Sequence, residues 1–116
     1  MIDLSIVLPS IRKPNLIPLY NSILGSTKRS FELIAVGPFE LPDELQHKEN
    51  VKYIKDYGSP VRCSNIGVCA AEGKYLKWTA DDAVYLPEAI DKNLEELEKM
   101  EFNEKNVVTQ GYFEGI

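Results

Sequence analysis

The chain has 116 residues, enough for a single compact domain over residues 1–116 with a modest hydrophobic core. Its 44% hydrophobic and 27% charged residues are typical of a soluble globular protein. The net charge of -5 argues against non-specific binding to nucleic acid or to an anionic membrane surface. No apolar run approaches the roughly 20 residues of a membrane helix, and the N-terminus has no signal-peptide pattern. We therefore expect a cytoplasmic protein without a transmembrane segment.

Strand and helix patterns alternate from the start of the chain. Residues 4–8 form a continuous apolar run that predicts a buried strand, which Pro9 ends. Residues 15–24 carry an apolar stripe at helical spacing, and Gly25 follows it. Residues 31–36 predict a second buried strand.

The middle of the chain repeats this order. Residues 41–47 predict a short helix, and residues 51–54 a short third strand. Ser59 and Pro60 are a helix start, with a capping residue followed by proline at the first helical position. This helix is expected to run to about residue 72 and to end at Gly73. Its many small residues suit either a tight wall beside a ligand or simply a helix buried against a sheet.

The last third predicts a strand at residues 75–78 and an amphipathic helix that opens at Pro87. Residues 107–113 predict a final strand. The cysteines, Cys63 and Cys69, do not share a helix face, so we expect them to be reduced packing residues. His47 lies in a polar stretch and is expected to be a solvated surface side chain.

The strict alternation predicts an α/β fold, a three-layer sandwich with a mostly parallel sheet. Ligands of such sheets bind at the carboxyl ends of the strands. The loops at residues 9–13, 37–40, 56–62 and 80–82 are expected at that edge. They carry three basic residues and two adjacent carboxylates: Arg12, Lys13, Arg62, Asp81 and Asp82.

The adjacent carboxylates Asp81 and Asp82 follow the strand at residues 75–78. Carboxylates at the end of a buried strand are costly unless a divalent cation, a basic partner or a helix N-terminus lies beside them. Mg²⁺ is commonly held by one or two carboxylates, with substrate phosphates and water completing its shell. The pair therefore indicates metal-dependent handling of a phosphate-bearing substrate.

Residues 5–10 read Ser-Ile-Val-Leu-Pro-Ser, and this segment resembles the first strand of glycosyltransferase family 2. Residues 58–76 resemble its Ala-Arg-Asn-x-Gly-x-x-x-Ala-x-Gly-x-Tyr-Ile segment, and residues 73–87 have the spacing of its Asp-x-Asp region. The resemblance covers nearly the whole chain and is most specific over residues 65–87. It implies the nucleotide-sugar-binding half of a GT-A fold, with inverting transfer to an acceptor hydroxyl.

On this resemblance Asp82 matches the second acid of Asp-x-Asp and would bind Mg²⁺ or Mn²⁺, while Ala80 falls where the first acid is expected. The second strand ends in Gly37 rather than in the acid that reads the nucleotide base, so UDP-type and GDP-type donors both stay open. Ser64 replaces the arginine expected before Asn65. The ligand edge and the resemblance together assign these residues to the nucleotide sugar: Pro9, Ser10, Arg12, Gly37, Arg62, Asn65 and Asp81.

The family's acceptor site and catalytic base lie in a later half, so no catalytic residue is assigned. We expect the chain alone to be inactive, and to form a homo-oligomer through an exposed sheet edge at residues 107–113. The alternative function is a non-catalytic GT-A-like interaction or assembly module. A different nucleotide-binding protein, such as a nucleotidyltransferase, is disfavoured because no Gly-rich phosphate loop follows the first strand.

Overall fold

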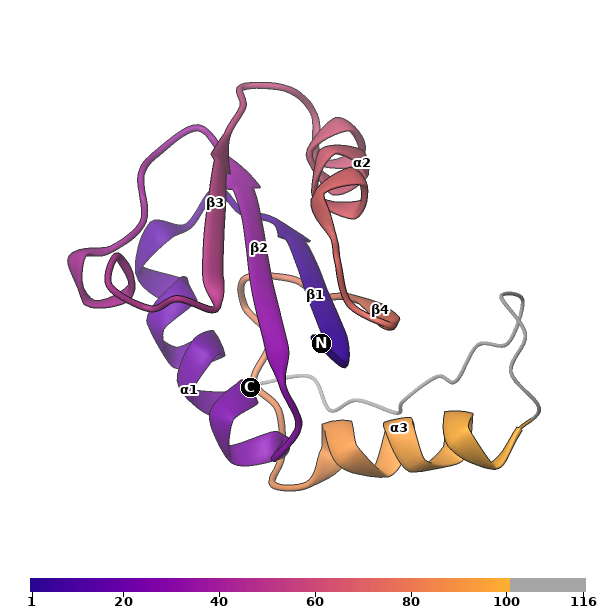
Figure 1. Ribbon diagram of the computed structural model, residues 1–116. Helices are drawn as coiled ribbons and strands as arrows, with labels where there is room; N and C mark the ends of the chain where they lie inside the picture. The colour runs from indigo at the N-terminus through magenta and orange to yellow at the C-terminus, as the bar shows by residue number, and fades with distance from the viewer. Residues whose placement is uncertain (101–116) are drawn as a thin grey trace.

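The computed structural model describes residues 1–100, which build one four-stranded sheet with helices on both faces (Figure 1). All of its strand pairs are parallel, and the strand order is β3-β2-β1-β4. The strands are β1 (Leu4–Pro9), β2 (Phe31–Gly37), β3 (Val51–Lys55) and β4 (Tyr75–Trp78). The helices are α1 (Leu16–Ser26), α2 (Pro60–Ala70) and α3 (Ala89–Lys99), with 3₁₀ turns η1 (Lys13–Asn15) and η2 (Asp43–Leu45).

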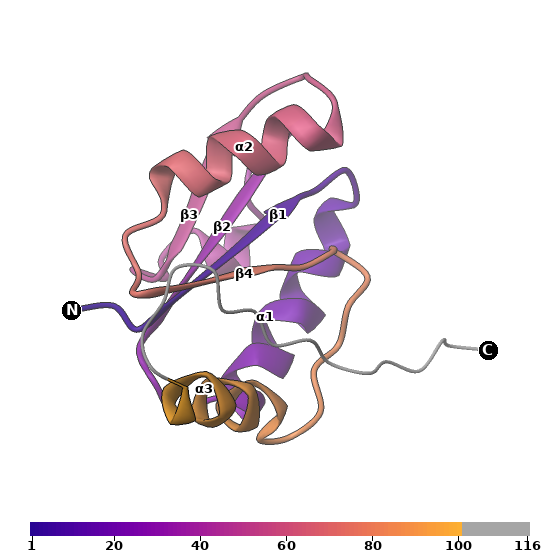
Figure 2. The same cartoon turned by 90° about the vertical axis from the view of Figure 1, so that its right-hand side faces the viewer.

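Helices α1 and α3 lie on one face of the sheet and α2 on the other (Figure 2). The period-two alternation of β1 explains this arrangement. Ile6 and Leu8 belong to the core under α1 and α3, whereas Val7 packs with Cys63 of α2. The expected three-layer α/β sandwich with a parallel sheet is therefore confirmed.

Strand register brings the carboxyl ends of the strands together. Pro9 of β1 lies opposite Val36 of β2, and Gly37 lies opposite Lys55 of β3. The loops that follow these strands therefore start side by side, as the sequence predicted for the ligand edge. Among residues 1–100, no helix has the length and apolar character needed to cross a bilayer.

At the opposite edge a buried carboxylate ties the strands to one another. Glu32 accepts hydrogen bonds from the Ser5 hydroxyl at 2.6 Å and the Glu72 amide at 2.7 Å, and it pairs with the Lys52 ammonium at 2.7 Å. Burial raises the pKa of Glu32, but the bonds from Lys52, Ser5 and Glu72 outweigh burial and leave it below its ordinary value.

Two helix boundaries differ from the sequence prediction. Helix α2 ends at Ala70, because the next residues leave it to join this buried network, and Gly73 donates its amide to Ser5 Oγ at 2.7 Å. Helix α3 starts at Ala89 rather than Pro87, after Glu88 with a left-handed φ of 64°. The predicted helix at residues 41–47 is only the turn η2, and the predicted strand at residues 107–113 lies outside the described residues.

Candidate functional site

A cavity of about 360 Å³ lies at the carboxyl ends of β1, β2 and β3, between the start of α2 and the loop after β4. Five of the residues assigned from the sequence line it: Pro9, Ser10, Arg12, Gly37 and Asp81. Its lining is mainly apolar, with a small number of charged groups from separate loops, as in many small-molecule sites. The predicted ligand edge therefore does contain a cavity.

Asp81 is buried and binds the loop that follows β1. Its Oδ2 accepts hydrogen bonds from the Ser10 hydroxyl at 3.2 Å and from the amides of Ile11 at 3.3 Å and Arg12 at 3.0 Å. Its Oδ1 accepts one from the Arg12 guanidinium at 2.5 Å. Burial raises the pKa of Asp81, but the bonds and charge of Arg12 leave it below its ordinary value. Asp81 is thus an ionised anchor for the loop.

Arg12 lies between the two adjacent carboxylates. Its Nη2 is 2.5 Å from Asp81 Oδ1 and 3.6 Å from Asp82 Oδ2. The side chain of Asp81 is 3% exposed, whereas those of Arg12 and Asp82 are 53% and 62% exposed. The two adjacent acids therefore have different environments, because Asp81 fixes the loop and Asp82 faces solvent.

Asp81 and Asp82 could hold a divalent cation only weakly. Both oxygens of Asp81 already accept hydrogen bonds, and Ala80 offers no side-chain ligand. Within residues 1–100 there is no cluster of three or more His, Cys, Asp or Glu side chains able to hold a metal. Asp82 remains, and a bound ion there would need phosphates and water for most of its shell.

The far wall of the cavity is built by β2 and β3. Gly37 approaches the loop after β1 so closely that a Cβ atom would lie 2.0 Å from the Ser10 carbonyl oxygen, so no acid fits at this position. The Asp56 amide donates to the Gly37 carbonyl at 2.8 Å, which places Asp56 directly beside it. The Asp56 carboxylate accepts from the Gly58 amide at 2.9 Å and from Arg62 Nε at 3.1 Å, and both bonds lower its pKa.

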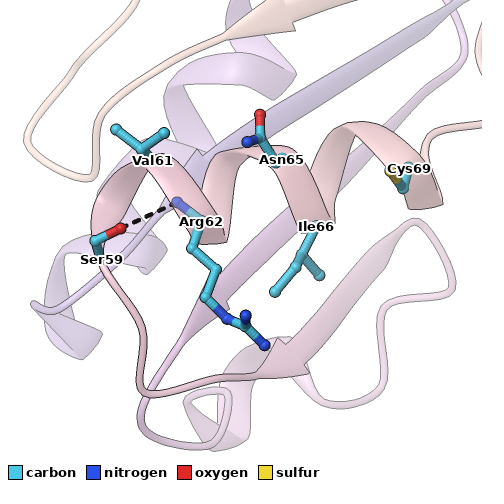
Figure 3. Close-up of a pocket in the computed structure, with 6 residues that line it drawn as sticks. All are labelled: Ser59, Val61, Arg62, Asn65, Ile66 and Cys69. Carbon is cyan, nitrogen blue, oxygen red and sulfur yellow. Dashed lines mark hydrogen bonds between the residues drawn. The ribbon is translucent and has the colours of Figure 1, made fainter.

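Helix α2 presents the remaining assigned residues on a different surface. Ser59 caps the helix by accepting a hydrogen bond from the Arg62 amide at 3.2 Å (Figure 3). Arg62 and Asn65 line a shallow hollow along the outside of α2, and neither lines the cavity at the strand ends. The Arg62 side chain reaches back to Asp56, a residue that does line that cavity.

Sequence reasoning did not assign Asp56 and Tyr57, although both line the cavity. Neither lies in a recognisable motif. The available signal was position, because both follow β3 directly and therefore fall on the ligand edge.

No protein-family model matches the chain. It is 25% identical over 116 residues to an uncharacterized glycosyltransferase of Rickettsia conorii, covering 93% of this chain and 19% of that protein. Uncharacterized glycosyltransferases of Rickettsia bellii and Rickettsia prowazekii are 26% and 28% identical, covering 85% and 84% of this chain and 16% and 35% of those proteins. The chain thus spans at most about a third of these relatives.

Among solved structures, the fold matches that of Staphylococcus aureus TarS residues 1–349, a family 2 glycosyltransferase, with a TM-score of 0.67 and 18% identity. The match covers 94% of this chain and 39% of TarS. The expected resemblance is confirmed: in sequence and in fold, this chain is similar to the N-terminal half of GT-A glycosyltransferases.

Proposed function

We propose that the cavity binds a nucleotide-activated sugar, and that the chain is the donor-binding part of an inverting glycosyltransferase. The observation that carries the proposal is the pair Arg12 and Asp81 at the cavity wall. The buried carboxylate holds a half-exposed guanidinium in place, and guanidinium groups bind phosphate oxygens well. Relatives named as glycosyltransferases support the reaction class.

A divalent cation at Asp82 belongs to this proposal. When bound, Mg²⁺ or Mn²⁺ would offset charge on the phosphates of the donor and of the leaving nucleotide. Because Asp82 is a single exposed carboxylate beside Arg12, we expect little metal binding before the nucleotide arrives.

The described residues supply no free carboxylate for catalysis in the cavity. Its two lining acids, Asp56 and Asp81, are each paired with an arginine. We therefore propose that an acceptor site and a general base lie outside residues 1–100, and that the chain alone is inactive. Incubation with sugar nucleotides and acceptors should give no turnover, and clear turnover by the chain alone would contradict this part.

Calorimetric titration with UDP and GDP, in Mn²⁺ and in EDTA, tests the central claim. We expect saturable 1:1 binding that weakens about fivefold or more in Arg12→Met. Lys28→Met is the matched control, because it removes an exposed charge before β2, at the opposite edge of the sheet. Equal affinities of the two variants would remove Arg12 from the site.

The second candidate is a non-catalytic GT-A-like module. Its specific support is that Asp81 is fully engaged in holding the loop after β1, while Ala80 provides no ligand. Under this alternative neither nucleotide binds under any metal condition, so the same titration separates the two functions.

A further inference from the structure

We infer that the Arg12 guanidinium blocks cation binding between Asp81 and Asp82 in the nucleotide-free chain, and that the phosphates of the nucleotide remove this block by pairing with Arg12. This inference rests on the proposed function, because it concerns the regulation of the same site. It makes Asp81 Oδ1 a second cation ligand beside Asp82, one that is accessible only when Arg12 moves away.

A single guanidinium nitrogen faces both acids. Arg12 Nη2 lies 2.5 Å from Asp81 Oδ1 and 3.6 Å from Asp82 Oδ2. Carboxylate oxygens are the ligands that Mg²⁺ and Mn²⁺ prefer, and two carboxylates are a common protein contribution to such a site. Arg12 therefore supplies the positive charge that a cation would otherwise supply between these two oxygens.

The two oxygens of Asp81 have different partners. Oδ2 accepts from the Ser10 hydroxyl and from the amides of Ile11 and Arg12, and these bonds hold the loop after β1. Within residues 1–100, Oδ1 accepts a hydrogen bond only from the Arg12 guanidinium. Movement of that guanidinium would therefore free Oδ1 for a cation while the three bonds to Oδ2 keep the loop in place.

Arg12 is held in position although its side chain is half exposed. Exposed ion pairs usually contribute little, because two long side chains lose conformational freedom in forming them. The Asp81 carboxylate is different, since it is buried and already fixed by the loop after β1. The guanidinium is therefore kept between the two acids before any ligand arrives.

Phosphate groups in the cavity would change this arrangement. Arg12 lines the cavity, and phosphate oxygens are strong acceptors for a guanidinium. Pairing with phosphate draws the guanidinium away from Asp81 Oδ1 and offsets its charge, and both effects favour a cation between the acids. Two unit charges about 4 Å apart in water change an equilibrium about fivefold, and a divalent ion experiences more, so we expect Arg12 to weaken cation binding about tenfold or more.

The test measures Mn²⁺ affinity of the nucleotide-free chain by electron paramagnetic resonance of the unbound ion. Arg12→Met should bind Mn²⁺ about tenfold or more tightly than the wild type, although the same variant should bind nucleotide more weakly. Lys13→Met is the matched control, because it removes the same charge from the next residue, at the start of η1, and should leave Mn²⁺ affinity unchanged. Adding Asp82→Asn to Arg12→Met should abolish the gain, which separates this pair of acids from non-specific binding by unfolded chain.

A second measurement tests release by the nucleotide. The factor by which UDP raises the Mn²⁺ affinity of the chain, corrected for Mn²⁺ bound to UDP in solution, should be smaller in Arg12→Met, because no block remains to be removed. An equal factor in both proteins, unchanged Mn²⁺ affinity in Arg12→Met, or an equal gain in Lys13→Met would overturn the inference while leaving nucleotide binding intact. Absence of nucleotide binding by the wild type in Mn²⁺ and in EDTA would overturn the proposed function and this inference together.

Discussion

Replacing Asp81 with alanine should destabilise the fold even though the residue lies in a motif expected to serve the ligand. The change leaves the Ser10 hydroxyl, in a residue only 1% exposed, without its acceptor. A buried donor left unsatisfied costs about 1–3 kcal/mol. The Ile11 and Arg12 amides are nearer the surface and recover bonds to water, so we expect a total loss of about 2–3 kcal/mol.

Asp82→Ala is the matched control, because it removes the same group from the next position, where the side chain is 62% exposed. Its effect should stay within about 0.5 kcal/mol. Urea unfolding followed by circular dichroism measures both variants. Since domains of this size have about 5–15 kcal/mol of stability, both should remain folded in buffer. Equal unfolding midpoints would refute the anchoring role of Asp81.

The pH dependence of stability is a second measurement of how Asp81 anchors the loop after β1. The folded-state pKa of Asp81 is lowered, so its contribution is complete above the unfolded-state pKa of about 4 and is lost as the pH falls through the lower folded value. Wild-type stability should therefore decrease below about pH 4, and Asp81→Ala should show a smaller decrease. A wild-type and a variant curve of identical slope would show that the carboxylate gains nothing from its partners.

Four further changes follow from packing, backbone conformation and charge, each measured by urea unfolding. A Cβ atom at Gly67 would lie 2.3 Å from Val7 Cγ1, so Gly67→Ala should lower the free energy of unfolding by about 1–3 kcal/mol. A Cβ atom at Gly25 would have nothing within 4 Å, so Gly25→Ala should instead stabilise α1 by up to about 1 kcal/mol. Glu88→Gly should stabilise by about 1 kcal/mol, because Glu88 adopts a left-handed φ of 64°. The pKa of Glu32 is lowered, so Glu32→Gln should flatten the loss of stability as the pH falls through the acid range. An unchanged midpoint in any of the first three variants, or an unchanged pH slope in Glu32→Gln, would contradict the reason given for that variant.

The four described strands were predictable from local patterns, because β1 and β2 are mainly apolar runs and β3 and β4 are short segments rich in aromatic and branched side chains. The start of α3 was not, because it depends on a distant contact. The Ile90 amide donates to Ser26 Oγ at 2.9 Å, which attaches the first turn of α3 to the end of α1. Proline chemistry at residue 87 could not indicate this partner, which lies about sixty residues earlier in the chain.

The candidate site likewise has features that the sequence predicts and features that it does not. Parallel topology placed the strand-end loops at one edge correctly, but it gave no means to tell Asp81 from Asp82. Which of the two is buried depends on the loop after β1, about seventy residues away, whose hydroxyl and amide donors all converge on Asp81. Asp56 shows the same limit, because its place beside Gly37 in the cavity lining depends on a bond between β2 and the end of β3 that no local motif encodes.

Charge at the ligand edge connects the arginine pairs with the expected metal. Two arginines, Arg12 and Arg62, lie against three carboxylates, Asp56, Asp81 and Asp82, so these five groups sum to -1. Fixed guanidinium groups orient a diphosphate at little entropic cost, yet this sum gives a diphosphate no net attraction. A divalent ion carried in with the nucleotide and held by Asp82 would change the sum to +1. The titrations in Mn²⁺ and in EDTA therefore have a definite expected order, with tighter nucleotide binding in Mn²⁺, and equal affinities would show that the arginines alone supply the charge that the phosphates need.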